Sequence, residues 1–395
     1  MTGAILSINS GSSSIKFGLF ETCDGKLRHA AGGKLEKIGI SPRLEVRDRA
    51  GDVIATREWV GEAQLTHAAL LEDLFGWAQE HLPHRPIAAV GHRVVHGGTD
   101  FTAPVLVDAA TLQQLEGLGA LAPLHQPHNL AAIRAIARLA PGLPQVACFD
   151  TAFHAAMPDV ATRLPIPRKY GEQGIRRYGF HGLSYEYIAQ ALQEAHPALA
   201  GGRVIVAHLG NGASMCAMHG GRSVDTTMGF TALDGLVMGT RSGALDPGVV
   251  LHLVQHMGLS AAEAEAMLYR ESGLLGLSDL SSDMRTLHAS DDPYAAQALE
   301  SFAWSAARQA AGLCASLGGL DTLVFTAGIG ENDAAMRAAI VDRLGWLGTV
   351  LDEDANRRHA AVISSAQSKV SVLVIPTDEE VMIVRHAQRL TTGAG

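Results

Sequence analysis

The chain has 395 residues, of which 47% are hydrophobic, so it can build large cores, and two domains are the expected organisation. A formal net charge of -9 argues against a general role in nucleic-acid binding, although a local basic pocket for an anionic substrate is still possible. The four scattered cysteines lack metal-ligand spacing, and neither a signal-peptide pattern nor a long apolar run occurs, so we expect a cytoplasmic protein without a membrane span.

The first predicted unit is a strand, a turn and a second strand. Residues 4–8 are apolar, and residues 14–20 alternate apolar and polar side chains. The turn between them, residues 9–13, is rich in Gly and Ser, whose backbone N–H groups and hydroxyls suit an anion. Lys16 follows at a reach suited to a phosphate. Taken alone, the stretch also fits an ordinary polar hairpin.

The rest of the chain alternates strands and helices. Up to residue 150, the pattern predicts strands at 35–38, 44–48, 53–59, 88–95 and 146–149, and helices at 62–82, 108–118 and 127–139. Beyond it, strands are predicted at 204–207, 215–218, 222–225, 323–326 and 372–375, and helices at 247–256, 261–270, 294–317 and 334–344. Both halves open with a strand, a glycine turn and a strand, so the element order indicates a duplicated α/β fold.

Three glycine-rich polar turns follow predicted strands, at Asn9–Ser14, His208–Ser214 and Gly328–Asn332. The patterns G-x-x-x-x-G-K-[ST] and G-x-G-x-x-G are absent. Small residues let the backbone approach a phosphate closely. Three such turns in two halves predict a nucleotide bound in a cleft between domains.

Several charged residues stand at predicted strand ends or among glycines. Arg93 lies inside an otherwise buried strand, and Arg241 is flanked by glycines. Arginine forks suit carboxylate and phosphate oxygens, whereas a structural pairing with an acidic residue is the alternative for each. Asp150 could orient such an arginine or hold a metal, and Glu379, expected at a strand end, could reach Mg²⁺. Among 18 histidines, His181 and His208 stand out, because they adjoin glycine-rich stretches.

Nine ordered stretches carry a family pattern: NSGSSSIKF, GHRVVHGG, FDTAFH, RRYGFHG, HLGNGAS, SVDTTMGF, GTRSGALDP, FTAGIGEN and IPTDEE. With them, the chain from residue 7 to about 380 resembles the acetate kinase family of the actin-like and sugar-kinase ATPase superfamily. The resemblance implies an α/β fold of two duplicated actin-like (ribonuclease H-like) domains with a central cleft. The first would span 1–150 and be joined by a C-terminal helix at 381–395. The second, 151–380, would bind nucleotide and form a homodimer.

The resemblance also implies the reaction and the residues that perform it. The reaction is reversible, Mg²⁺-dependent, in-line transfer of the ATP γ-phosphate to acetate, which gives acetyl phosphate and ADP. The catalytic residues would be Asp150, His181 and Arg241, and the metal ligands Asn9 and Glu379, with Mn²⁺ as an alternative ion. The acetate site would comprise Arg93, Val95, Leu124, Phe180 and Ala232. ATP would contact Ser14, Lys16, His208, Leu209, Gly210, Asn211, Gly212, Asp283, Met284, Arg285, Gly328, Ile329, Gly330, Glu331 and Asn332.

Departures from the family pattern qualify these expectations. Asp378 stands where the family usually has Asn, which predicts a tighter or more Mn²⁺-tolerant metal site. His125-Gln126 replaces the usual His-Asn. Ala232 stands where a proline usually lines the acyl pocket, so propionate or a broader range of short-chain acids is an alternative substrate. A sugar or polyol kinase would need a carboxylate base and a polar pocket, and an actin-like ATPase would use no acyl acceptor.

Overall fold

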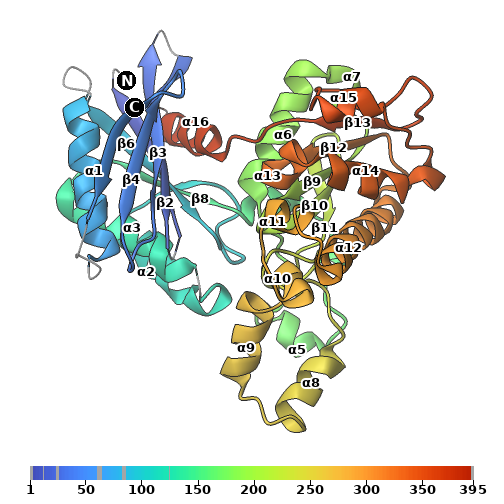
Figure 1. Cartoon of the computed structure of the whole chain (residues 1–395). Coiled ribbons are helices and arrows are strands. Elements are labelled where there is room, and N and C mark those ends of the chain that lie inside the picture. Colours follow the sequence, from blue (N-terminus) through green and yellow to red (C-terminus); the bar gives the residue numbers. More distant parts are fainter. Residues whose placement is uncertain are drawn as a thin grey trace. The chain divides into compact units, whose positions relative to one another are not determined.

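The computed structural model describes residues 3–11, 13–23, 26–59, 65–81, 86–123 and 125–392. The chain forms two compact units (Figure 1). Unit 1 comprises residues 1–153 and 378–395, and unit 2 comprises residues 154–377. The boundaries expected from the sequence were 150/151 and 380/381. Among the described residues, no helix combines the length and apolar composition needed to cross a membrane.

Unit 1 is built on one sheet with the strand order β5-β4-β3-β2-β1-β6-β8-β7. Its strands are β1 (Ala4–Ser10), β2 (Ile15–Cys23), β3 (Lys26–Glu36), β4 (Arg43–Asp48), β5 (Val53–Glu58), β6 (Ile87–Val94), β7 (Val105–Leu106) and β8 (Gln145–Phe149). Its helices are α1 (His67–His81), α2 (Ala109–Gly117), η1 (Gly119–Leu121), α3 (Gln126–Leu139) and α16 (Glu379–Thr392), and η2 (Ala152–Ala156) begins at its edge.

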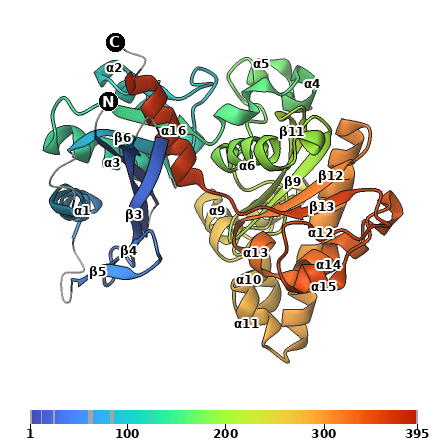
Figure 2. The same ribbon diagram turned by 90° about the horizontal axis from the view of Figure 1, so that it is seen from above.

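The apolar periodicity of the sequence explains how unit 1 is layered. Alternate residues of β1 and β2, such as Leu6 and Phe17, form one core with Leu70 of α1 and Ile136 of α3. The last helix of the chain, α16, packs against β1, β6 and β8 (Figure 2) and buries Met382. A segment from the far end of the chain therefore becomes part of unit 1.

Unit 2 is built on a second sheet with the order β11-β10-β9-β12-β13. Its strands are β9 (Arg203–Leu209), β10 (Ala213–His219), β11 (Arg222–Thr226), β12 (Thr322–Thr326) and β13 (Ser371–Val374). Figure 2 shows α6 and α12 on opposite sides of this sheet. The helices are α4 (Asp159–Thr162), α5 (Arg168–Gly171), α6 (Gly182–Ala195), α7 (Pro197–Ala200), α8 (Pro247–Gln255), α9 (Ala261–Arg270), α10 (Gly273–Ser278), α11 (Met284–His288), α12 (Pro293–Leu317), α13 (Ala327–Asn332), α14 (Ala334–Asp342), η3 (Gly345–Leu347) and α15 (Glu353–Arg357).

The two sheets repeat one topology. In unit 1, β3, β2 and β1 are antiparallel neighbours, and β1, β6 and β8 then pair in parallel. In unit 2, β11, β10 and β9 are antiparallel, and β9, β12 and β13 pair in parallel. The mixed α/β fold with duplicated strand order is therefore confirmed at the level of the sheets.

Several elements differ from the sequence-based expectation. The predicted glycine turn at 328–332 is part of the short helix α13, whose carbonyls at Gly330 and Glu331 accept hydrogen bonds from Arg337. Glu379 does not end a strand but opens α16, which therefore begins two residues before the expected residue 381. Helix α6, which the apolar pattern did not reveal, starts at Gly182.

Candidate active site

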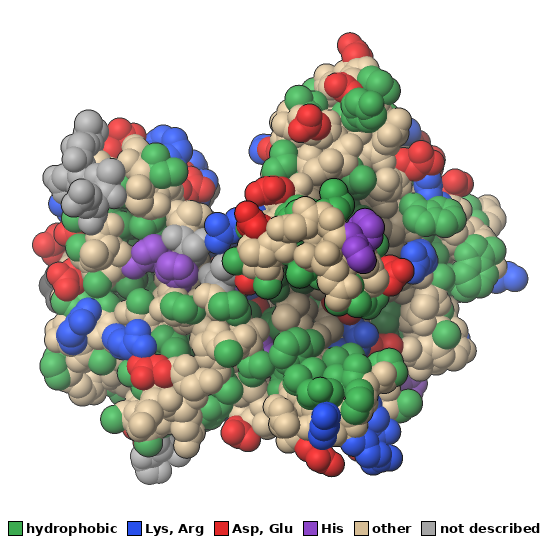
Figure 3. All heavy atoms as spheres, turned by 90° about the horizontal axis from the view of Figure 1, so that it is seen from below, with side chains coloured by type: hydrophobic (Ala, Val, Ile, Leu, Met, Phe, Trp, Pro, Cys, Tyr) green, Lys and Arg blue, Asp and Glu red, His purple; other side chains and the backbone are tan. Residues whose placement is uncertain are grey.

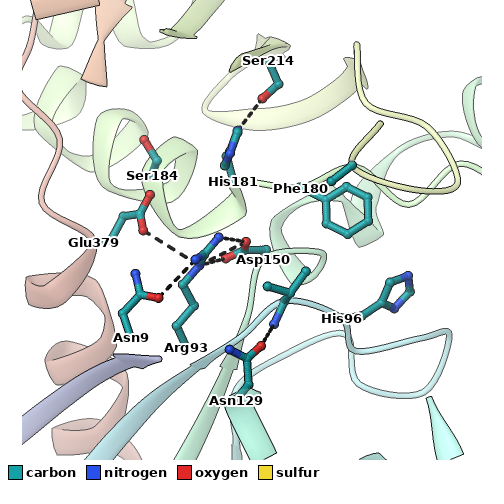
Figure 4. A network of polar contacts seen from close by, with 12 residues as sticks. Asn9, Arg93, His96, Asn129, Asp150, Phe180, His181, Ser184, Ser214 and Glu379 are labelled. Atoms are coloured by element: carbon teal, nitrogen blue, oxygen red, sulfur yellow. Dashed lines mark hydrogen bonds and ion pairs between the residues drawn. The ribbon is translucent and has the colours of Figure 1, made fainter. Parts of the chain in front are cut away.

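Three polar side chains of unit 1 lie where neighbouring parallel strands end. Asn9 is near the end of β1, Arg93 is near the end of β6, and Asp150 directly follows β8. The backbone N–H of Asp150 donates to the carbonyl of Val94 over 3.1 Å, which continues the pairing of β8 with β6. Because parallel strands end at a common edge, the three side chains converge (Figure 4), and this edge is where open α/β sheets bind ligands.

The Arg93 guanidinium is held by acidic and amide oxygens. Its Nε donates to Asp150 Oδ1 over 2.9 Å, Nη2 donates to Oδ2 over 2.5 Å, and Nη1 donates to Asn9 Oδ1 over 3.1 Å. Burial by itself lowers the pKa of Arg93, but the carboxylates of Asp150 and Glu379 outweigh it and raise the pKa above its ordinary value. Asp150 is 1% exposed, and it orients Arg93, which is one of the two roles expected for it.

The first turn of α16 adds carboxylates to this cluster. Glu379 Oε2 lies 4.0 Å from Arg93 Nε. Burial and the neighbouring Glu379 raise the pKa of Glu380. Asp378 Oδ1 accepts a hydrogen bond from the backbone N–H of Val381 over 2.9 Å, so this carboxylate caps α16. Asp and Asn cap helices about equally well, so this contact is open to either residue, and the effect of Asp378 on a metal site stays a prediction.

A buried asparagine that the sequence reading missed supports the same edge. Asn129 of α3 accepts from the backbone N–H of Val95 over 3.0 Å and donates to the carbonyl of Ser10 over 2.6 Å, so it joins the ends of β6 and β1. One turn earlier, the Gln126 amide bonds both the N–H and the C=O of His96. Two amide side chains on the otherwise apolar buried face of this helix are the signal that could have found them.

In unit 2, the start of α6 faces the hairpin of β9 and β10. His181 is the N-cap residue of α6, in a left-handed conformation with φ of 57°. Its Nδ1 lies 2.8 Å from the hydroxyl of Ser214 (Figure 4), and its ring stacks on His208 with centroids 4.2 Å apart. His208 Nδ1 in turn lies 2.8 Å from the hydroxyl of Ser184. Ser214 and His208 are register partners, so one strand pair positions both contacts.

The glycine turn between β9 and β10 brings His181 and Arg241 together. A Cβ atom on Gly212 would lie 3.3 Å from Arg241 Nη2 and 3.4 Å from His181 Nε2. The Arg241 fork is fixed on its other side, where Nη1 donates to the carbonyl of Ala232 over 2.8 Å. Gly239 closes against the turn, since a Cβ there would meet Asn211 Oδ1 at 2.0 Å. The turn therefore needs glycine for close approach, and two nitrogen donors converge beside it.

The same turn forms one wall of a cavity inside unit 2. The cavity has a volume of about 740 Å³. The segments that line it come from the turn, from the start of α11, and from α13 and the start of α14: Gly210, Asn211, Ser282, Asp283, Met284, Arg285, His288, Gly328, Ile329, Asn332, Asp333 and Ala334. Asp283 caps α11 and binds Arg285, and this hydrogen bonding lowers the pKa of Asp283 to about 2. Three stretches expected to contact a nucleotide thus meet at one cavity.

Some residues expected at the nucleotide have other contacts. Glu331 accepts hydrogen bonds from the backbone N–H groups of Ala327 and Thr377, over 2.8 and 3.2 Å. The fully buried Arg337, which the sequence reading missed, donates to the carbonyls of Gly330 and Glu331. These contacts fix the backbone of α13. Ala327 has φ of 65°, a left-handed conformation that this framework holds.

The remaining expected positions are distributed between the units. In unit 1, Val95 is buried, Ser14 is partly buried, and Lys16 is exposed opposite Asn9 in the register of β1 and β2. In unit 2, Phe180 is buried and Ala232 is partly buried. Leu124 lies outside the described residues.

Comparison with known proteins identifies the family of the chain. The model of the acetokinase family matches residues 4–385. An acetate kinase of Rhodopseudomonas palustris is 52% identical over 403 residues, covering 100% of both chains, and one of Nitrobacter hamburgensis is 52% identical, covering 98% of this chain and 96% of its own.

A propionate kinase structure from Francisella tularensis has a TM-score of 0.92 at 38% identity, covering 98% of this chain and 100% of its own. An acetate kinase structure from Porphyromonas gingivalis has a TM-score of 0.87 at 35% identity, covering 98% and 99%. The chain belongs to the acetokinase family.

Proposed function

We propose that this enzyme transfers the γ-phosphoryl group of ATP directly and reversibly to the carboxylate of acetate, giving acetyl phosphate and ADP. The turn at residues 210–212 is the observation that carries the proposal. Its Gly210 and Asn211 line the 740 Å³ cavity, and its Gly212 lies beside the nitrogen donors of His181 and Arg241. A nucleotide in this cavity would direct its phosphates toward those donors.

The acceptor dictates what the protein must supply. A carboxylate is ionised at neutral pH, so no general base is needed, and catalysis rests on positioning and on charge stabilisation. Asp150 supports this view, because its oxygens accept hydrogen bonds from Arg93. In our proposal Arg93 binds the acetate carboxylate, and Asp150 orients Arg93 rather than accepting a proton.

The donors beside Gly212 act on the group being transferred. Arg241 Nη2 and His181 Nε2 are placed to donate to equatorial oxygens of the phosphoryl group, where charge spreads in the transition state. Because both donors are held by other protein contacts, little reorganisation is needed during the reaction. The N-terminus of α6 adds backbone polarity that favours an anion.

The residues of unit 1 fit Mg²⁺ that is bound together with nucleotide phosphates. Among the described residues, no group of at least three acidic, histidine or cysteine side chains could hold a metal by itself. Mg²⁺ commonly takes one or two protein carboxylates plus substrate phosphates, and the Asn9 amide oxygen and the Glu379 carboxylate are such donors. Bound there, the ion would neutralise phosphate charge. Glu379→Gln should then raise the Mg²⁺ concentration for half-maximal activity, and an unchanged titration would remove Glu379 from the metal site.

Hydroxylamine trapping tests the proposed reaction. An acyl phosphate reacts with hydroxylamine to give a hydroxamate, whereas a phosphorylated alcohol or free phosphate does not. We expect hydroxamate to form from acetate and MgATP with the parent, and to be lost with Arg241→Ala. ATP hydrolysis without hydroxamate would instead indicate an ATPase that uses no acyl acceptor.

Propionate is a second candidate acceptor. A solved relative at 38% identity is a propionate kinase, and Ala232 offers a smaller side chain than the family's proline. Phe180 directly follows Tyr178 and Gly179, whose backbone N–H groups donate to the carbonyl of Gly229, so its segment runs beside the stretch that leads to Ala232. We propose that these side chains belong to the acyl pocket.

We further propose that unit 2 pairs with a second copy of the chain. Helix α8 buries none of its residues, and Leu245, Val249, Leu251, Val254 and Met257 in and around it are exposed. Figure 3 views the molecule from the side of α8 and shows hydrophobic side chains gathered there. Large exposed apolar patches mark interaction sites. Leu251→Glu should convert a dimer into a monomer in sedimentation experiments, and a monomeric parent would contradict the proposal.

The buried free thiols of Cys148, Cys216 and Cys314 and the use of ATP are consistent with a reducing cytoplasm, which we propose as the location.

A further inference from the structure

Two buried hydroxyl groups form a chain behind the imidazole of His181. The Ser214 hydroxyl lies 2.8 Å from His181 Nδ1, and the Tyr185 hydroxyl lies 2.5 Å from the same serine oxygen. Both residues have a relative exposure of 0%, so water does not compete for these contacts. Tyr185 follows His181 by one helical turn on α6, and Ser214 is the second residue of β10, so helix and sheet meet at this point.

The hydrogen-bond inventory of the three groups allows a chain of donors that ends at His181. Tyr185 O–H can donate to Ser214 Oγ, and the serine hydroxyl can then donate to His181 Nδ1. The neutral imidazole that accepts at Nδ1 carries its proton on Nε2. That nitrogen is the one that lies beside Arg241 at Gly212, where the phosphoryl group is expected.

The ring of His181 is also constrained on its face. It stacks on His208 with an interplanar angle of 19°, and His208 is itself bound through Ser184 to the Thr377 hydroxyl. Stacking fixes the plane of the ring, while a contact at Nδ1 fixes its rotation within that plane. With the serine hydroxyl donating to Nδ1, the chain fixes where Nε2 points and leaves the proton on that nitrogen.

We propose that Ser214 and Tyr185 are positioning residues that hold His181 as the Nε2–H tautomer aimed at the transferring phosphoryl group. This inference rests on the proposed function, because it assigns the ligand of Nε2. Neither residue touches the substrate in this scheme. Both act through His181, and that dependence is what distinguishes them from residues that only support the fold.

A double-mutant cycle tests the dependence. Partners that orient a functional histidine at metal sites typically contribute about 10- to 100-fold, and we expect a loss of kcat in this range for Ser214→Ala. Tyr185→Phe keeps the ring and removes one hydroxyl, so a loss of about 2- to 10-fold is expected, the equivalent of one hydrogen bond. In a His181→Ala background, each change should alter kcat by less than about twofold, because the group through which it acts is gone.

Ser223→Ala is a matched control. Ser223 is also buried, and its hydroxyl lies 2.8 Å from Nδ1 of another buried histidine, His154. We expect this variant to lower the unfolding temperature but to leave kcat near the parental value. If Ser214→Ala keeps the parental kcat, or loses the same factor with and without His181, the proposal is wrong.

A spectroscopic readout separates failure of this inference from failure of the proposed function. With ¹⁵N-labelled histidine, the parent should show an Nε2–H imidazole for His181, and Tyr185→Phe should weaken that preference. Tyr185→Phe decides the matter if Ser214→Ala does not fold. A parent that forms no hydroxamate would overturn the proposed reaction, and the tautomer of His181 could still be measured. An Nδ1–H tautomer in an active parent would overturn only the positioning role of Ser214 and Tyr185.

Discussion

The two units hold their key arginines in opposite ways. In unit 1, Arg93 is bound by the carboxylate of Asp150 and lies near Glu379. In unit 2, Arg241 donates to a neutral backbone carbonyl, and His181 contacts a neutral hydroxyl. A carboxylate both fixes an arginine and neutralises its charge, whereas the carbonyl of Ala232 fixes one end of the Arg241 fork without neutralising it. We therefore expect Arg93 to matter for stability as well as binding, and Arg241 to matter mainly for the chemical step.

Arg93→Ala should have the largest effect. Removing one partner of a buried ion pair typically costs about 3–5 kcal/mol, because the other charge stays buried, and Asp150 is 1% exposed. The free energy of unfolding should fall by this order, and the KM for acetate should rise. Adding Asp150→Ala should recover part of the stability but none of the activity. Denaturant unfolding of both variants checks this, and an Arg93→Ala protein as stable as its parent would contradict the comparison.

Arg241→Ala should lower kcat by about 100- to 1,000-fold, since losing one preorganised donor to developing charge costs about 2.7–4 kcal/mol. Its hydrogen bond to Ala232 leaves a neutral carbonyl behind, whereas Arg93→Ala leaves the buried charge of Asp150, so we expect its unfolding free energy to change less than that of Arg93→Ala. Arg203→Ala is the control, since its ion pair with Asp321 is half exposed and lies outside the proposed site. Comparable losses of stability in the two active-site variants would erase the distinction between the units.

Acid should destabilise both units through buried neutral histidines. Burial lowers the pKa of His92 in unit 1 and of His154 in unit 2 to about 4, from 6.5. Between pH 6.5 and 4 the unfolded chain takes up protons that the folded chain refuses, so stability falls as pH falls, by at most about 1.4 kcal/mol per pH unit for each histidine. His154→Gln should flatten the dependence of unfolding free energy on pH. A slope equal to that of the parent would show that His154 does not contribute.

Ala232→Pro should have the smallest effect and should act on specificity. We expect the parent to use propionate with a kcat/KM within about tenfold of acetate, or about 1.4 kcal/mol, because the two ring carbons that proline would add leave space about the size of one methylene. Butyrate should be clearly worse. Proline keeps the carbonyl that binds Arg241 and should restore preference for acetate. Kinetics with the three acids on both proteins check this, and an unchanged ratio of acetate to propionate would show that position 232 does not set chain length.

The sequence by itself determined the strands, most long helices and the chemical type of the site. Alternating and continuous apolar runs predicted β1, β2, β9 and β12 within a few residues. In a strand, the spacing of apolar residues follows directly from which side chains are buried. The glycine-rich turns and the isolated arginines indicated a protein that binds anions, since small residues let the backbone approach a phosphate and arginine forks suit phosphate and carboxylate oxygens. The order of strands in the two halves also indicated duplication, which the sheets confirm.

Only the tertiary structure decided which groups share a hydrogen bond. Asn129 donates to the carbonyl of Ser10, which lies 119 residues earlier in the sequence, and no local pattern marks such a contact. Ser214 and Tyr185 are separated by 29 residues and resemble ordinary core residues in the sequence. The capping role of Asp378 and the start of α16 at Glu379 likewise depend on backbone geometry. Sequence patterns report whether a side chain is buried, whereas the direction of a hydrogen bond depends on how separate elements pack, and that is fixed only when the chain folds.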